Sequence, residues 1–514
     1  MSKRVTSILL IVVSVLLVGT LTVQGLYMAG ILNREKTVET QVVTEAEPVT
    51  EMSAAAETET TSVVETETVD APENGADSEI EEDAEATDTS DVETVEVTQP
   101  ETKSETSKYT LSHDGYTLEQ VVVFSRHNIR SPLIRGGSIL STATPHTWFP
   151  WSSGASELSL RGGLLETEMG QYFRKWLEKE GLFPENYLPE DGAVRVYANS
   201  KQRTIATAEY FASGLLPTAN IPVEYHVEFD KMDPVFTPQF TFLTPAYQAA
   251  VDAQIHELFD EAVAGLADNY ELLSDVIDLQ DSQGWKDGSV APFVTDDLEM
   301  TLELDSEPKM TGTLKTACSI SDALVLQYYE QADEKLAAFG HDLSFEDWRE
   351  ISEVKDLYGD ILFSAPLVAP HVAHPILEEI RAEMTNERRQ FTFLCGHDSN
   401  VGSILASLGA ADYTCPGAIE RKTPIGCKIV LAKWLAEDGA EYWSLDLVYQ
   451  SAEQLRGMPL LDLENPPVVY PIELTGLTRN ADGLYDAAAL LERFDEAIGE
   501  YDELMELYAL DVAA

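Results

Sequence analysis

The 514-residue chain has few basic residues and few cysteines. Its 33 Lys and Arg are outnumbered by 90 Asp and Glu, which gives a formal net charge of -57. Nucleic-acid affinity comes mainly from Lys and Arg that neutralise phosphates, so this charge argues against a nucleic-acid partner. The four cysteines form no CxxC motif and no Cys/His group, so the sequence indicates neither a zinc site nor another cofactor.

The cysteines also do not form an obvious disulfide framework. Cys318 and Cys395 lie in apolar patterns, and we interpret both as small buried side chains. Cys415 and Cys427 fall in a predicted loop-to-strand region, and the sequence leaves open whether they form a disulfide.

Charged residues are absent from Ile8 to Leu32, a stretch preceded by Lys3 and Arg4. About 20 apolar residues suffice to cross a bilayer. A cleavable signal peptide is the alternative, but Val23-Gln24-Gly25 is a poor cleavage site and the apolar run continues past it. We therefore expect a cytoplasmic tip and signal anchor in residues 1–36, with the rest of the chain outside the cytoplasm at the cell membrane. Cleavage would make the protein secreted.

Residues 37–107 contain no aromatic side chain and are rich in Thr, Glu and Val. Such a composition cannot bury enough apolar surface to offset the entropy of ordering. We expect a disordered acidic stalk that self-repulsion keeps extended.

A globular composition begins near residue 108 and continues to residue 514. Three β-branched and aromatic runs predict buried strands. They are Val121–Phe124, Val194–Ala198 and Phe391–Leu394. Helical patterns cover Leu160–Lys179 and Ala206–Phe211, and the alternation of strands and helices predicts an α/β fold with a mainly parallel sheet. Residues 241–370 look helical instead, so we expect a helical insertion beside an α/β part made of residues 108–240 and 371–514.

Polar side chains suited to phosphate follow each predicted strand. They are Arg126, His127 and Arg130 after the first, Arg203 after the second, and His397 and Asp398 after the third. Singly, each group could be a solvated strand end or a helix cap. Ligands of open α/β sheets, however, bind beyond the carboxyl ends of the strands. A convergence of positive charge in so acidic a chain predicts an anion site.

Phosphoryl transfer needs these residue types. Arginine guanidinium groups match phosphate oxygens bidentately, and a neutral imidazole can form a covalent intermediate. A carboxylic acid can protonate the leaving alcohol.

The same segments resemble the histidine acid phosphatases. The resemblance rests on Arg126-His-Asn-Ile-Arg-Ser-Pro132, Gln202-Arg-Thr-Ile-Ala-Thr-Ala208 and Gly396-His-Asp398, and it extends from Tyr109 to about Tyr501. It is strongest toward the glucose-1-phosphatase branch, in which Asn128 replaces the glycine of most members. The resemblance implies a phosphoglycerate-mutase-like sheet domain flanked by helices, with an inserted smaller helical domain and the substrate cleft between them.

The resemblance also implies roles for the six residues. His127 would be the phosphohistidine nucleophile and Asp398 the proton donor. Arg126, Arg130, Arg203 and His397 would bind the phosphate, and no metal would take part. We therefore expect an extracytoplasmic acid phosphatase that hydrolyses small phosphate monoesters such as glucose 1-phosphate.

Three alternatives stay open. A phytase would use the same chemistry, although so acidic a domain should repel a polyanion such as inositol hexakisphosphate. A phosphoglycerate mutase shares the Arg-His signature but acts on cytoplasmic metabolites. A non-enzymatic surface-displayed binding protein would have no need of the six intact residues. The sequence specifies neither the physiological substrate nor the oligomeric state.

Overall fold

The computed structural model of the protein describes residues 109–134 and 138–508. They belong to the second of two units into which the chain divides, Gln99–Ala514. The predicted anchor in residues 1–36 and stalk in residues 37–107 lie outside the described residues, so both stay predictions. Within the described ranges, no helix is both long enough and apolar enough to cross a membrane.

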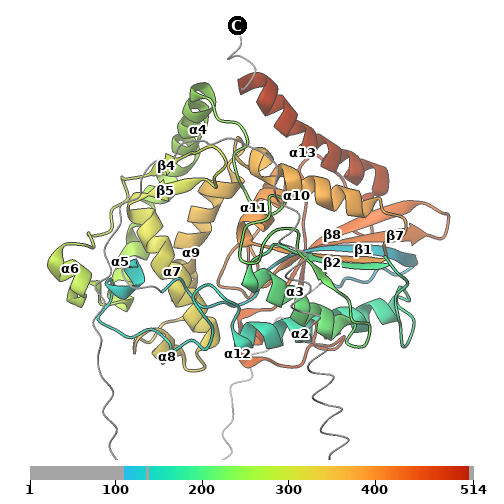
Figure 1. Cartoon of the computed structure of the whole chain (residues 1–514), viewed down its shortest axis with the longest axis horizontal. Coiled ribbons are helices and arrows are strands. Elements are labelled where there is room, and N and C mark those ends of the chain that lie inside the picture. The colour runs from blue at the N-terminus through green and yellow to red at the C-terminus, as the bar shows by residue number, and fades with distance from the viewer. Residues whose placement is uncertain (1–108, 135–137, 509–514) are drawn as a thin grey trace, which may run out of the picture. The chain divides into compact units, whose positions relative to one another are not determined.

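A mixed sheet with the strand order β10-β8-β7-β1-β6-β2-β3 forms the centre of the α/β part, and β9 pairs with β8 (Figure 1). The strands are β1 Tyr116–Arg126, β2 Val194–Ala198, β3 Val223–Glu224, β6 Phe391–Gly396, β7 Lys428–Ala436, β8 Glu441–Tyr449, β9 Val468–Pro471 and β10 Tyr485–Asp486. The three predicted strands are confirmed as β1, β2 and β6. They lie side by side and parallel, with Val121 and Val194 both in register with Phe391.

The expectation of a mainly parallel sheet holds for only half of it. The pairs β1–β6, β6–β2 and β2–β3 are parallel, whereas β7, β8, β9 and β10 pair antiparallel. The reason lies in the connections. A tight turn with Gly439 at φ +87° joins β7 to β8, and such a turn can join only antiparallel strands.

Helices cover both faces of the sheet (Figure 1). On one face, α2 Leu160–Lys179 and α3 Gln202–Leu215 pack against the side chains of Val121 and Val123. On the other face, α10 Ala369–Met384, α11 Asp398–Ser407 and α13 Ala487–Tyr508 pack with Val122 and Phe124. Successive β1 side chains therefore point into two separate cores, as a strand buried on both faces requires.

The segment between α3 and α10 is largely helical. Its elements are α4 Pro245–Ala264, α5 Ala267–Val276, α6 Gln283–Asp287, β4 Glu299–Thr301, β5 Lys309–Thr311, α7 Gly312–Glu330, α8 Glu334–Ala337 and α9 Phe345–Gly359. Helix α7 is central, since Leu314, Ile320 and Leu324 are all buried. The same apolar cluster includes Ile129 and Leu165 from the sheet part, so the helical segment is packed firmly beside the loop that follows β1.

Candidate active site

The predicted site residues lie at the carboxyl ends of β1, β2 and β6. His127 follows β1, Arg203 lies in the first turn of α3 after β2, and Asp398 is the first residue of α11 after β6. Because the three strands are parallel, their carboxyl ends meet at one edge of the sheet. Backbone contacts join them there, since the amide of His127 donates to the carbonyl of Gly396 at 3.0 Å. The structure thus brings the three separate segments together.

His127 is 4% exposed, and its Nδ1 lies 2.8 Å from the carbonyl oxygen of Asn128. A carbonyl oxygen can only accept, so Nδ1 carries the proton and Nε2 keeps its lone pair. Burial and the charge of Arg203 hold the pKa of His127 well below its ordinary value. The imidazole therefore stays neutral, with its lone pair at Nε2, below the ordinary pKa of histidine.

His397 lies edge-on to His127, with the ring centroids 5.5 Å apart. Asn199 Nδ2 lies 2.7 Å from His397 Nε2, and the amide orientation is set because the Asp233 amide donates to Asn199 Oδ1. Nε2 of His397 is therefore an acceptor, and its proton sits on Nδ1. Arg203 Nη2, 3.4 Å from Nδ1, can also only donate, so these two N–H groups call for a shared acceptor such as an anion. Burial lowers the pKa of His397 strongly, so the ring is neutral and offers one N–H donor. The orienting role of Asn199 was not predicted from the sequence, although Asn199 directly follows β2.

The three arginines bring positive charge into a buried place. Arg126 is 2% exposed, and Arg126 Nε and Arg203 Nε find no hydrogen-bond acceptor among the described residues. Burial and the neighbouring Arg130 lower the pKa of Arg203 to about 10. Unsatisfied buried donors and crowded cations both favour a bound anion. Within the described ranges, no group of His, Cys, Asp and Glu is placed to hold a metal ion.

Asp398 lies next to Arg126, with 3.0 Å between Oδ2 and Nη2. Its Oδ1 accepts from the amide of Ser399 at 3.0 Å. Burial by itself would raise the pKa of Asp398, but Arg126 and Lys355 outweigh it and hold the pKa well below the ordinary value. The carboxyl group is therefore ionised when Arg126 is its partner.

Arg126 has a second, fully buried carboxylate beside it. Glu420 Oε1 lies 3.7 Å from Arg126 Nη1, and Tyr329 donates to Glu420 Oε2. Glu420 lies in the loop before β7 and Tyr329 in α7, so this contact ties the helical segment to the edge of the sheet that bears the candidate site. No pattern in the sequence indicated Glu420, since it belongs to none of the three motifs.

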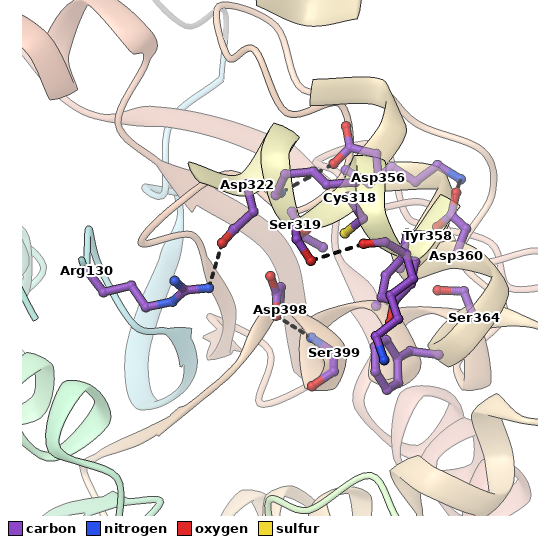
Figure 2. Close-up of a pocket in the computed structure, with 17 residues that line it drawn as sticks. Arg130, Cys318, Ser319, Asp322, Asp356, Tyr358, Asp360, Ser364, Asp398 and Ser399 are labelled. Atoms are coloured by element: carbon purple, nitrogen blue, oxygen red, sulfur yellow. Dashed lines mark hydrogen bonds and ion pairs between the residues drawn. The ribbon is translucent and has the colours of Figure 1, made fainter. Parts of the chain in front are cut away.

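A cavity of about 250 Å³ opens beside Asp398 (Figure 2). The sheet part contributes Arg130 and Asp398 to its wall, whereas α7 and α9 contribute residues such as Asp322 and Lys355.

Cys318 also lines the cavity and is only partly buried, so our interpretation of that cysteine as a small buried side chain is wrong. All four cysteines are free, which answers the question about Cys415 and Cys427 for this structure.

Residues 117–444 match the family described as histidine phosphatase superfamily (branch 2). The chain is 36% identical over 398 residues to a glucose-1-phosphatase of Salmonella typhimurium, covering 75% of this chain and 92% of that protein. A glucose-1-phosphatase of Providencia rettgeri is also 36% identical, covering 70% of this chain and 86% of that protein. The phytase AppA of Escherichia coli is 27% identical, covering 76% of this chain and 94% of that protein.

Solved structures agree with these matches. The phytase from Citrobacter braakii superposes with a TM-score of 0.67 at 26% identity, covering 75% of this chain and 98% of that one. The family match spans most of the described residues and includes all six predicted site residues. The chain therefore belongs to branch 2 of the histidine phosphatase superfamily and is a histidine-type acid phosphatase.

Proposed function

We propose that the enzyme hydrolyses small phosphate monoesters with an uncharged, hydroxyl-rich leaving group, such as glucose 1-phosphate. The supporting observation is the pairing of charges in the cavity beside Asp398. Its wall holds four basic side chains, Arg130, Lys315, Lys355 and Lys422, and four acidic ones, Asp322, Asp356, Asp360 and Asp398.

Three of these cations have carboxylate partners in the wall itself. Arg130 lies 2.9 Å from Asp322, Lys355 3.7 Å from Asp356, and Lys422 3.4 Å from Asp360. Figure 2 shows the ion pair that joins Arg130 to Asp322 in the cavity wall. A polyanionic leaving group needs unpaired positive charge, whereas alternating donors and acceptors suit sugar hydroxyls.

The first chemical step in this proposal forms a bond from His127 Nε2 to phosphorus and breaks the bond from phosphorus to the alcohol oxygen. The guanidinium groups of Arg126, Arg130 and Arg203 and the Nδ1–H of His397 bind the three non-bridging oxygens. Fixed donors around a transferring phosphoryl group supply most of the catalysis in such reactions.

The departing alcohol oxygen needs a proton, and Asp398 is ionised while Arg126 is its partner. An arriving phosphate competes for Arg126 and brings negative charge near Asp398, and both effects raise the pKa of its carboxyl group. A phosphate monoester has a second pKa of about 6, so below that pH the substrate arrives as a monoanion. We infer that Asp398 passes this proton from the substrate to the leaving oxygen, which predicts an acidic optimum.

In the second step, the Asp398 carboxylate takes a proton from water while the water oxygen attacks phosphorus. The bond from phosphorus to His127 Nε2 breaks, the imidazole is neutral again, and Asp398 returns its proton to the inorganic phosphate, which leaves as a monoanion. Both steps use Asp398, first to give and then to take a proton.

A substrate panel tests this proposal. Rates with the full-length protein should be compared for glucose 1-phosphate, p-nitrophenyl phosphate and inositol hexakisphosphate at pH 4 to 7. We expect kcat/KM for glucose 1-phosphate to exceed that for inositol hexakisphosphate near pH 6. Equal or higher kcat/KM for the hexakisphosphate would favour a phytase, the candidate supported by the 27% identity to phytase AppA.

We also propose that the N-terminal segment Ile8–Leu32 anchors the protein in the cell membrane with its catalytic part outside the cytoplasm. This rests on the sequence alone. Full-length protein should stay with membranes after a high-salt wash, and mature protein beginning near Leu26 in the medium would contradict the anchor.

A further inference from the structure

A fully buried ion pair lies behind the loop that follows β1. Lys428, the first residue of β7, and Glu166, in α2, are both 0% exposed, and Lys428 Nζ lies 3.0 Å from Glu166 Oε1. Taking two charges out of water is costly, and well-packed apolar residues of similar volume are often as stable or more stable. Holding α2 against β7 therefore does not explain why charges occupy these positions.

The polar contacts of the pair converge on the loop. Glu166 Oε1 also accepts from Asn128 Nδ2 at 2.8 Å, while Glu166 Oε2 has no hydrogen-bond partner in the described part of the chain. Lys428 Nζ donates in addition to the carbonyl of Gly426 at 2.8 Å. The amide of Gly426 in turn donates to the carbonyl of His127 at 3.3 Å. Glu166 and Lys428 thus both make hydrogen bonds to residues next to His127, namely Asn128 and Gly426.

Asn128 is held at every polar atom of its side chain. Its Oδ1 accepts from the backbone amide of Ile129 at 2.8 Å, and the backbone amide of Asn128 donates to Thr207 Oγ1 at 3.2 Å. Gly426 adopts φ +69°, and a Cβ there would lie 2.6 Å from Asn128 Nδ2. Only glycine therefore leaves room for the Asn128 side chain to reach Glu166.

The carbonyl of Asn128 is the group that accepts the Nδ1 proton of His127 at 2.8 Å. A rotation of the Asn128 peptide would break this hydrogen bond and release the imidazole to its other tautomer. We propose that Glu166, held in place by Lys428, is a positioning residue that acts through Asn128 to keep His127 in its nucleophilic tautomer and orientation. The inference rests on the proposed role of His127 as nucleophile.

The first test replaces the pair by apolar residues in the full-length protein. The E166L/K428M variant should fold with a Tm at or above that of the parent, because the buried charges are gone. Its turnover should nevertheless fall on the order of 10- to 100-fold, the usual cost of misplacing a reacting group. The inhibition constant for inorganic phosphate should not change, because Arg126, Arg130 and Arg203 are untouched. The control is K433M/E441L, which removes a solvent-facing pair between β7 and β8 (2.7 Å between Lys433 and Glu441) and should leave turnover unchanged.

A second comparison keeps the test decisive if that variant does not fold. E166Q should slow turnover in the parent. When E166Q is added to N128G, turnover should fall by less than about a further twofold, because double-mutant coupling appears only between residues that act together. The change in Tm caused by E166Q should appear both in the parent and in N128G. Parental turnover in E166L/K428M, or equal slowing by E166Q with and without N128G, would overturn the inference.

Rapid-quench labelling with a radiolabelled phosphate ester separates this inference from the proposed function. Label on His127 in the parent, formed equally fast in E166L/K428M, would overturn the positioning role alone. Absence of labelled histidine in the parent would overturn the proposed mechanism and the inference with it.

Discussion

Asp446 gives the stability of the enzyme a pH dependence that can be measured. It lies in β8 and is 5% exposed, and its Oδ2 has no hydrogen-bond partner among the described residues. Burial raises the pKa of Asp446 from the ordinary 3.8 to about 7. The folded protein therefore holds this proton at a pH where the unfolded chain has released it.

The sign and size of the effect follow from this difference. Below about pH 4 the carboxyl group is protonated in both states, so Asp446 causes no loss of stability. Between about pH 4 and pH 7 only the unfolded chain ionises, and the free energy of unfolding falls as pH rises. Each pKa unit corresponds to about 1.4 kcal/mol, so the loss at neutral pH is on the order of 4 kcal/mol.

The D446N variant removes this ionisation and keeps the shape of the side chain. Urea unfolding of the parent and D446N at pH 4, 5, 6 and 7 should show the variant gaining stability over the parent as pH rises. The replacement D438N, in the exposed turn between β7 and β8, serves as the control. A difference between D446N and the parent that does not vary with pH would refute the reasoning.

Three further predictions concern catalysis. D398N should lower glucose 1-phosphate hydrolysis by about 10²- to 10⁴-fold but p-nitrophenyl phosphate hydrolysis much less, because p-nitrophenolate leaves without a proton; equal losses would contradict the role of Asp398. Burial raises the pKa of Asp356 to about 6, so below pH 6 it leaves Lys355 unpaired. The unpaired Lys355 should then attract inositol hexakisphosphate by about 1 kcal/mol, so kcat/KM for this substrate should rise about fivefold relative to kcat/KM for glucose 1-phosphate. The D356N variant should abolish this pH dependence. EDTA should leave activity unchanged, and a loss that zinc or magnesium restores would contradict the arginine-based site.

Local patterns in the sequence were enough to predict the parts of the fold that bear the candidate site. The buried runs became β1, β2 and β6, and the apolar stripe from Leu160 to Lys179 became α2 with those same bounds. Their parallel pairing followed from alternation with helices. The antiparallel half did not follow, because the hairpin between β7 and β8 depends on a turn that we did not interpret.

The supporting residues of the site could not be predicted in the same way. Lys428 and Glu166 are 262 residues apart, and neither belongs to a recognisable motif. A lone Glu on a helix is usually solvated, and only the packing of α2 against β7 buries it beside Lys428. Glu420 and Asp322 are missed for the same reason, since periodicity predicts elements but not which distant side chains meet.

The central claim is that His127 carries the phosphoryl group during turnover. Full-length enzyme should be mixed with a radiolabelled phosphate ester, quenched in alkali because phosphohistidine is labile in acid, and digested for peptide mapping. We predict label on His127 in the parent, and no label and a loss of turnover by several orders of magnitude in H127A. Label on another residue, or H127A turnover within about tenfold (1.4 kcal/mol) of the parent, would contradict the account.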